Sequence, residues 1–182
     1  MVPIVDLDDP KTVLFDGAGR SAAFFCKGGS LAVGNRLLGQ LREYARARGG
    51  ANVRLCLHEG PRASFHEMII LEHRGRYRRP HKHPSKHESL HLVEGELGVF
   101  VFGEDGGLAC GERLDGRGSF LFWIEPDAYH SVVPLSEVVI YHECKPGPFL
   151  RDSDNVSAPW APDGSDPEAA QAYLENLRTA LP

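Results

Sequence analysis

The chain has 182 residues, of which 42% are hydrophobic, and its formal net charge is −5 at pH 7. This length supports one sizeable hydrophobic core and not two, so we expect a single domain. The mild acidity argues against nucleic acid and against an anionic membrane surface as partners. No secretory signal is visible and no stretch approaches the ~20 apolar residues of a bilayer-spanning helix, which predicts a cytoplasmic protein.

Residues 1–52 are expected to form an N-terminal extension with one helix, over residues 34–48. The apolar residues that recur there at helical spacing are Leu37, Leu38, Leu41, Tyr44 and Ala45. Arginines occupy the other side, which is the pattern of an amphipathic helix. Gly49 and Gly50 follow and predict the end of this helix.

From residue 53 to residue 150 the pattern changes to short runs of Val, Ile, Leu and Phe bounded by Gly, Pro and Asp, which is typical of β-strands. Strands are expected at residues 53–58, 66–73, 89–94, 98–103, 108–113, 119–124, 130–134 and 137–143. Their fairly regular spacing predicts an all-β sandwich or barrel. Residues 151–182 are expected to form a Pro- and Asp-rich tail and a short helix that begins at Pro167 and packs on the barrel.

The run from His81 to Glu88 carries the strongest functional signal. His81 and His83 are one residue apart, so on an extended strand both imidazoles point to the same side. The carboxylate of Glu88 follows after a short turn, and two imidazoles with one carboxylate suit a transition-metal ion. The less favoured interpretation is a set of surface histidines in a basic turn.

The spacing of glycines, histidines and carboxylate in this region resembles the first motif of the cupin superfamily. The matching residues are Gly75, His81, His83, Glu88 and Gly95. The resemblance implies a double-stranded β-helix (cupin jelly roll), here with an N-terminal helical extension and a short C-terminal helix.

A second cupin-like motif begins at Gly118 and ends at His130, with Pro126 in the turn before the histidine. This turn is one residue shorter than the usual motif and lacks its glycine. The resemblance nevertheless makes His130 the last ligand. The predicted cofactor is therefore one divalent transition-metal ion (Fe, Zn, Ni or Mn), and its predicted ligands are His81, His83, Glu88 and His130.

Strand alternation also places Tyr77 and Arg79 on the side of His81, as candidate catalytic residues. A guanidinium suits carboxylate and phosphate, so Arg79 would meet an anionic group of a substrate. Alternatively, Arg79 is a solvated member of a basic stretch. His91 is expected to point away from the metal, whereas His87 is either a replacement for Glu88 or a hydrogen-bonding partner of a ligand.

Longer segments are similar to the WbuC-type cupin-fold metalloproteins, over roughly residues 52–163. These segments are residues 77–84, 88–95, 102–106, 130–131, 143–149 and 158–162. The resemblance implies a small bacterial metal-binding cupin linked with O-antigen or surface-polysaccharide gene clusters. It supports the same four ligands.

The predicted function is that of a metalloenzyme acting on a small polar, sugar-derived substrate. Two alternatives stay open: an Fe(II)-dependent dioxygenase of a small molecule, and a metal-dependent small-molecule binding module without turnover. A homodimer is also predicted, because jelly rolls leave sheet edges that need cover.

Overall fold

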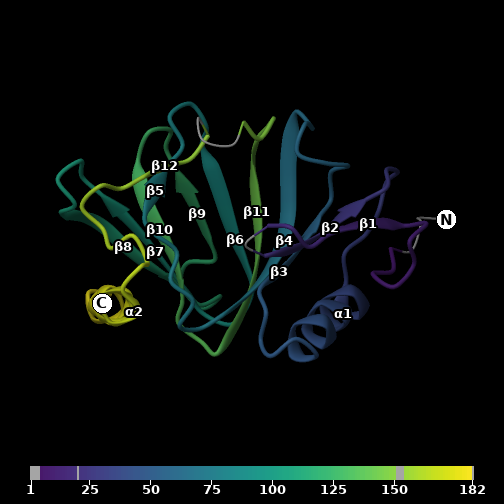
Figure 1. Cartoon of the computed structure of the whole chain (residues 1–182), viewed down its shortest axis with the longest axis horizontal. Helices are drawn as coiled ribbons and strands as arrows, with labels where there is room; N and C mark the ends of the chain where they lie inside the picture. Colours follow the sequence, from purple (N-terminus) through teal and green to yellow (C-terminus); the bar gives the residue numbers. More distant parts are fainter. Residues whose placement is uncertain (1–4, 20, 151–153, 182) are drawn as a thin grey trace.

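The computed structural model describes residues 5–19, 21–150 and 154–181. These residues form two sheets and two helices (Figure 1), which confirms the predicted all-β class. The larger sheet has the strand order β1 (Val13–Asp16), β2 (Ala22–Cys26), β3 (Val53–Cys56), β4 (Phe65–His73), β11 (Val138–Pro146), β6 (Glu88–Glu94) and β9 (Leu121–Ile124). The smaller sheet has the order β12 (Val156–Ser157), β5 (His81–Lys82), β10 (Tyr129–Pro134), β7 (Leu97–Phe102) and β8 (Leu108–Leu114).

The main core lies between the two sheets and follows from strand alternation. Val139 and Tyr141 of β11 point between the sheets, where they pack with Leu90 of β6 and Val99 of β7. All four side chains are fully buried. Because side chains alternate along a strand, the same face of β11 also sends polar residues into the interior further along.

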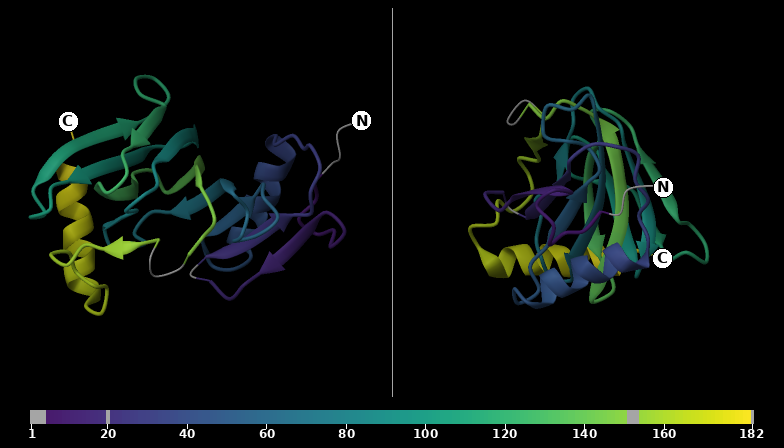
Figure 2. Two further views of the ribbon diagram at one scale, coloured as in Figure 1. Left: turned by 90° about the horizontal axis from the view of Figure 1, so that it is seen from above. Right: turned by 90° about the vertical axis from the view of Figure 1, so that its right-hand side faces the viewer.

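Each helix covers the outer face of one sheet. Helix α1 (Asn35–Arg46) packs its apolar side, with Leu41 fully buried, against Leu55 of β3 and Leu71 of β4. Helix α2 (Pro167–Thr179) presents Leu174 to Phe100 of β7. Figures 1 and 2 show the two helices at opposite ends of the molecule. None of the helices in the described residues has the length and apolar character needed to cross a membrane.

The eight predicted strands correspond to β3, β4 and β6 to β11, and both predicted helices are present. Strands β1, β2, β5 and β12 were not predicted. β5 and β12 have two residues each, too few for any alternation to show. β1 and β2 extend the larger sheet from within the N-terminal extension, where only a helix was expected, and β2 pairs in parallel with β3. The division of the chain at residues 52 and 150 stays a prediction.

Gly95, the last residue of the first motif, forms the turn between β6 and β7. Its φ of +83° lies in the left-handed region that favours glycine. A Cβ atom at this position would lie 2.6 Å from the main-chain oxygen of Val138. The motif therefore requires glycine here for the turn, and the residue does not take part in the chemistry of the site.

Candidate metal centre

Three of the predicted ligands come together in the barrel interior. His81 lies on β5 and is the register partner of His130 on β10, while His83 follows directly after β5. One ligand atom from each of the three side chains lies within 4.8 Å of the others, so the group could hold a metal ion. Each residue is buried, with between 1% and 6% of its surface exposed.

The hydrogen bonds of the three imidazoles define which ring nitrogen faces the centre. The Nδ1 atom of His130 lies 2.9 Å from the main-chain oxygen of Ala128, and that of His81 lies 3.3 Å from the oxygen of Arg79. The Nδ1 atom of His83 contacts the main-chain oxygen of Asp154. A carbonyl oxygen only accepts, so each Nδ1 carries a proton, and Nε2 is the ring nitrogen that can offer a lone pair to a metal ion.

The neutral form of His81 is favoured by its surroundings. Burial lowers the pKa of His81 well below its usual value, and the nearby guanidinium of Arg78 lowers it further. A neutral imidazole is the form that binds a metal ion.

Glu88, the first residue of β6, lies against two of the three imidazoles and is not itself part of the three-histidine group. Its Oε2 atom lies 3.0 Å from Nε2 of His130, and its Oε1 atom lies 3.4 Å from Nε2 of His83. Nε2 of His130 is buried and has no hydrogen-bond partner of acceptable geometry. When the His130 ring carries its proton on Nδ1 alone, Nε2 of His130 and Oε2 of Glu88 both present lone pairs to each other. A cation bound by both atoms would remove this repulsion. The donor set therefore fits a divalent transition-metal ion.

Lys145, near the end of β11, enters the same space. Its Nζ atom contacts Oε1 of Glu88, and it lies 3.0 Å from Oε1 of Glu143 and 3.5 Å from Nε2 of His83. Lys145 and Glu143 were not among the predicted site residues. Strand alternation could have found both, because they follow the inward-facing Tyr141 at intervals of two.

The carboxylates of Glu88 and Glu143 have different pKa shifts although both are buried. Burial would raise the pKa of Glu88, but the Lys145 ammonium and the adjacent imidazoles lower it well below its usual value. Burial raises the pKa of Glu143, the negative charge of Glu88 adds to this, and Lys145 offsets it only in part. The pKa of Lys145 is raised, because attraction to Glu143 and Glu88 outweighs the effect of burial. Neighbouring groups with opposed shifts are typical of sites that transfer protons.

Three carboxylates and two cations lie close together in the interior. Arg78 is paired with Glu72 (Nη2 to Oε1, 3.2 Å), and the pKa of Arg78 is raised by Glu72 and by the nearby Glu143 and Glu88. Lys145 contacts Glu88 and Glu143. Because the pKa of Glu143 is raised, the net charge of this group depends on whether Glu143 holds its proton, and a bound cation would favour the ionised form.

The two predicted catalytic residues contact the C-terminal tail. The hydroxyl of Tyr77 donates to the main-chain oxygen of Pro162 (2.6 Å), and Nε of Arg79 donates to that of Ala158 (2.8 Å). The strand alternation on which their placement rested does not apply, because β5 begins only at His81. Arg78, the residue immediately before Arg79, is the arginine close to the interior carboxylates. A catalytic role of Tyr77 and Arg79 stays a prediction.

The two remaining histidines of the motif region lie at the surface. His87 is exposed, with its ring centre 5.9 Å from that of Trp123. His91 is exposed on β6, with its ring centre 5.3 Å from that of Phe120. Neither belongs to the group of imidazoles that could hold a metal ion.

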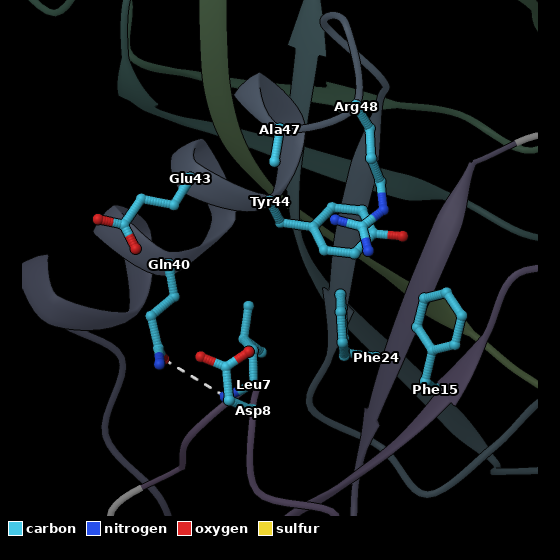
Figure 3. Close-up of a pocket in the computed structure, with 9 residues that line it drawn as sticks. All are labelled: Leu7, Asp8, Phe15, Phe24, Gln40, Glu43, Tyr44, Ala47 and Arg48. Atoms are coloured by element: carbon cyan, nitrogen blue, oxygen red, sulfur yellow. Dashed lines mark hydrogen bonds between the residues drawn. The ribbon is translucent and has the colours of Figure 1, made fainter.

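Two of the cavities in the described part of the chain lie outside the histidine cluster. One, of about 470 Å³, lies between α1 and the first two strands (Figure 3). The guanidinium carbon of Arg48 lies 3.8 Å from the centre of the Tyr44 ring on its wall. The other, of about 680 Å³, is lined by residues 58–64.

His58, beside the second cavity, is expected to make the stability of the fold depend on pH. Its ring stacks on that of His66 with centres 4.3 Å apart, and burial, with the charge of His66, lowers its pKa from 6.5 to about 4. The unfolded chain therefore binds more protons between these pH values, so stability is lost as the pH falls from 6.5 to 4. We expect His58→Gln to flatten this dependence in urea unfolding. The exposed His87→Gln is the control, and equal slopes in both variants would contradict the expectation.

The sheets and the site define the class of this protein as a cupin-fold jelly roll with a three-histidine cluster that could hold a metal ion. Among solved structures, CapF in complex with the inhibitor 3-isopropenyl-tropolone has a TM-score of 0.51 and 11% identity, over 80% of this chain and 33% of that chain. Oxalate decarboxylase from Bacillus subtilis has a TM-score of 0.46 and 16% identity, over 59% of this chain and 27% of that chain. Oxalate decarboxylase from Lactobacillus farciminis has a TM-score of 0.42 and 21% identity, over 52% of this chain and 26% of that chain.

The chain spans about a third or less of the length of these structures, and the likeness concerns the fold alone. A family described as Domain of unknown function (DUF6016) matches residues 33–114. No curated protein matches the sequence.

Proposed function

We propose that this chain binds one divalent transition-metal ion through the three imidazoles and Glu88, and acts as a metalloenzyme on a small polar substrate. The observation that carries the proposal is the arrangement of the hydrogen bonds. Each Nδ1 is held by a main-chain carbonyl, so the lone pairs of His81, His83 and His130 are on the nitrogens left for a metal. The buried carboxylate of Glu88 supplies the negative charge that such a centre needs.

A bound ion would supply Lewis-acid polarisation of a substrate oxygen or, in the case of iron, redox chemistry with dioxygen. The Lys145 ammonium, beside Glu88, is placed to hold an anionic oxygen of a substrate. Glu143, 3.0 Å from Lys145, is placed to accept or return a proton through it. Tyr77 and Arg79 remain candidates for substrate positioning from the tail side.

The substrate class and the biological context rest on resemblance. Similarity to the WbuC-type proteins supports a sugar-derived substrate and a link to surface-polysaccharide biosynthesis. A homodimer also stays part of the proposal. It is supported by β9, an edge strand of the larger sheet on which Leu121 and Trp123 are both about half exposed.

A second candidate function is a metal-dependent binding module without turnover. It is favoured by the burial of all four proposed ligands and by Lys145, which fills the space beside His83 and Glu88. Such a module would bind small molecules through the same residues, but it would not need a proton-transferring group.

Activity assays of the metal-loaded protein separate the two functions. Protein stripped with chelator is reloaded separately with Fe(II), Mn(II), Ni(II) or Zn(II), then assayed for oxygen consumption and for conversion of small carboxylates, sugars and nucleotide sugars. The metalloenzyme predicts turnover with at least one metal and its loss in Glu143→Gln. Metal-dependent thermal shifts by the same compounds, without turnover under any condition, would support the binding module instead.

A further inference from the structure

Lys86 and Asp154 form a buried ion pair next to the proposed centre. Lys86 lies in the turn between His83 and Glu88, and only 8% of its surface is exposed. Its Nζ atom contacts Oδ1 of Asp154, which is 5% exposed. Removing two charges from water is costly, so a buried pair is weak evidence for stability and raises the question of what geometry it fixes.

The pair joins the metal-binding turn to the chain that follows β11. Besides Asp154, Nζ of Lys86 donates to the main-chain oxygen of Pro148. The second carboxylate oxygen of Asp154 accepts from the backbone N–H of Leu150 (3.2 Å). The side chain of Asp154 is therefore held from both sides, and its main chain is held with it.

The main-chain oxygen of Asp154 is the partner of Nδ1 of His83. The sheet holds the residues before His83: β12 pairs with His81 and Lys82, and Ala158 N donates to the oxygen of Pro80 (2.8 Å). These pairings end at Lys82, so His83 lies just outside the strand. The main-chain oxygen of His83 accepts from the Asp127 N–H (2.8 Å), whereas the ring is held through Nδ1 by the main-chain oxygen of Asp154.

We propose that Lys86 and Asp154 are positioning residues for His83. Their ion pair keeps the Asp154 carbonyl on Nδ1, which keeps the proton there and the lone pair on Nε2. This inference rests on the proposed metal centre for its functional meaning, but the ring tautomer is a property of the metal-free protein. Partners that orient metal-binding histidines typically change metal affinity by about 10- to 100-fold when removed.

The test uses Lys86→Met, Asp154→Asn and the double variant in the full chain. Asp154→Asn keeps the size of the side chain and the main-chain carbonyl, so it is the milder variant if Lys86→Met folds poorly. Lys82→Met is the matched control, since this lysine is in the same segment but pairs with the exposed Glu104 and Asp127. The readouts are Co(II) affinity by chelator competition, the visible spectrum of bound Co(II), and the His83 tautomer of the metal-free protein by ¹⁵N NMR.

We expect each single variant to weaken Co(II) binding by about 10- to 100-fold, the double variant to lose no more than the worse single, and the Co(II) spectrum to change. His83 should lose its uniform Nδ1–H form in both single variants. The proposal would be overturned if the variants kept the His83 tautomer, the Co(II) affinity and the Co(II) spectrum of the wild type and showed only a lower unfolding midpoint. A changed tautomer in a chain whose wild type binds no Co(II) would uphold the positioning role and overturn the metal centre.

Discussion

Replacing His83 with alanine is expected to weaken metal binding by at least about 100-fold, because it removes one of four ligands and not merely a partner of a ligand. The fold should persist, since His83 lies outside the strands and makes no contribution to the main inter-sheet core. Calorimetric titration with Zn(II) or Co(II) measures the affinity, and circular dichroism follows the thermal unfolding of the metal-free protein.

His91→Ala is the matched control for this variant. His91 is also a histidine of the motif region, but it is exposed on β6 and outside the imidazole cluster. We expect wild-type affinity for His91→Ala. Equal affinities of the two variants would remove His83 from the set of ligands.

Replacing Lys145 with methionine is expected to destabilise the metal-free protein by about 3–5 kcal/mol. The substitution keeps much of the side-chain volume but leaves the buried carboxylates of Glu88 and Glu143 without their shared cation. A bound divalent ion can balance the negative charge of Glu88, so the loss of stability should be smaller when metal is present. Loss of a positive charge 3.5 Å from Nε2 of His83 should also strengthen metal binding.

Urea unfolding with and without Zn(II) measures both effects. Lys82→Met is the control: Lys82 also pairs with two carboxylates, but those of Glu104 and Asp127 are mostly exposed. We expect only a small change in that variant. An unfolding midpoint of metal-free Lys145→Met equal to that of wild type would show that Lys145 does not compensate the interior carboxylates.

Much of the fold was predictable because most of its strands and both helices show a pattern within a few neighbouring residues. Hydrophobic alternation and turn residues located eight strands, and the helical spacing around Leu41 located α1. The two-residue strands β5 and β12 carry no such pattern, since they are defined by pairing with neighbouring strands (β12 with β5, and β5 also with β10) and not by their own composition. The exposed β1 was missed for a related reason: three of its four residues face solvent.

The site was predictable only where its residues lie on regular strands or at motif spacing. The residues His81, His83 and His130 were found in this way, and the structure brings them together. Tyr77 and Arg79 were placed by an alternation that the chain does not follow before His81. Asp154 had no signal, because its contact with His83 joins residues 71 positions apart through a main-chain oxygen, which any residue type carries.

The metal content of the wild-type chain tests the central claim most directly. The protein is purified without chelators or a histidine tag, and its metals are quantified by elemental analysis before and after dialysis against a mixture of divalent transition metals. We expect about one metal ion per chain, retained through a desalting column. A chain that retains no metal even after dialysis would contradict this expectation and leave the jelly roll without its proposed centre.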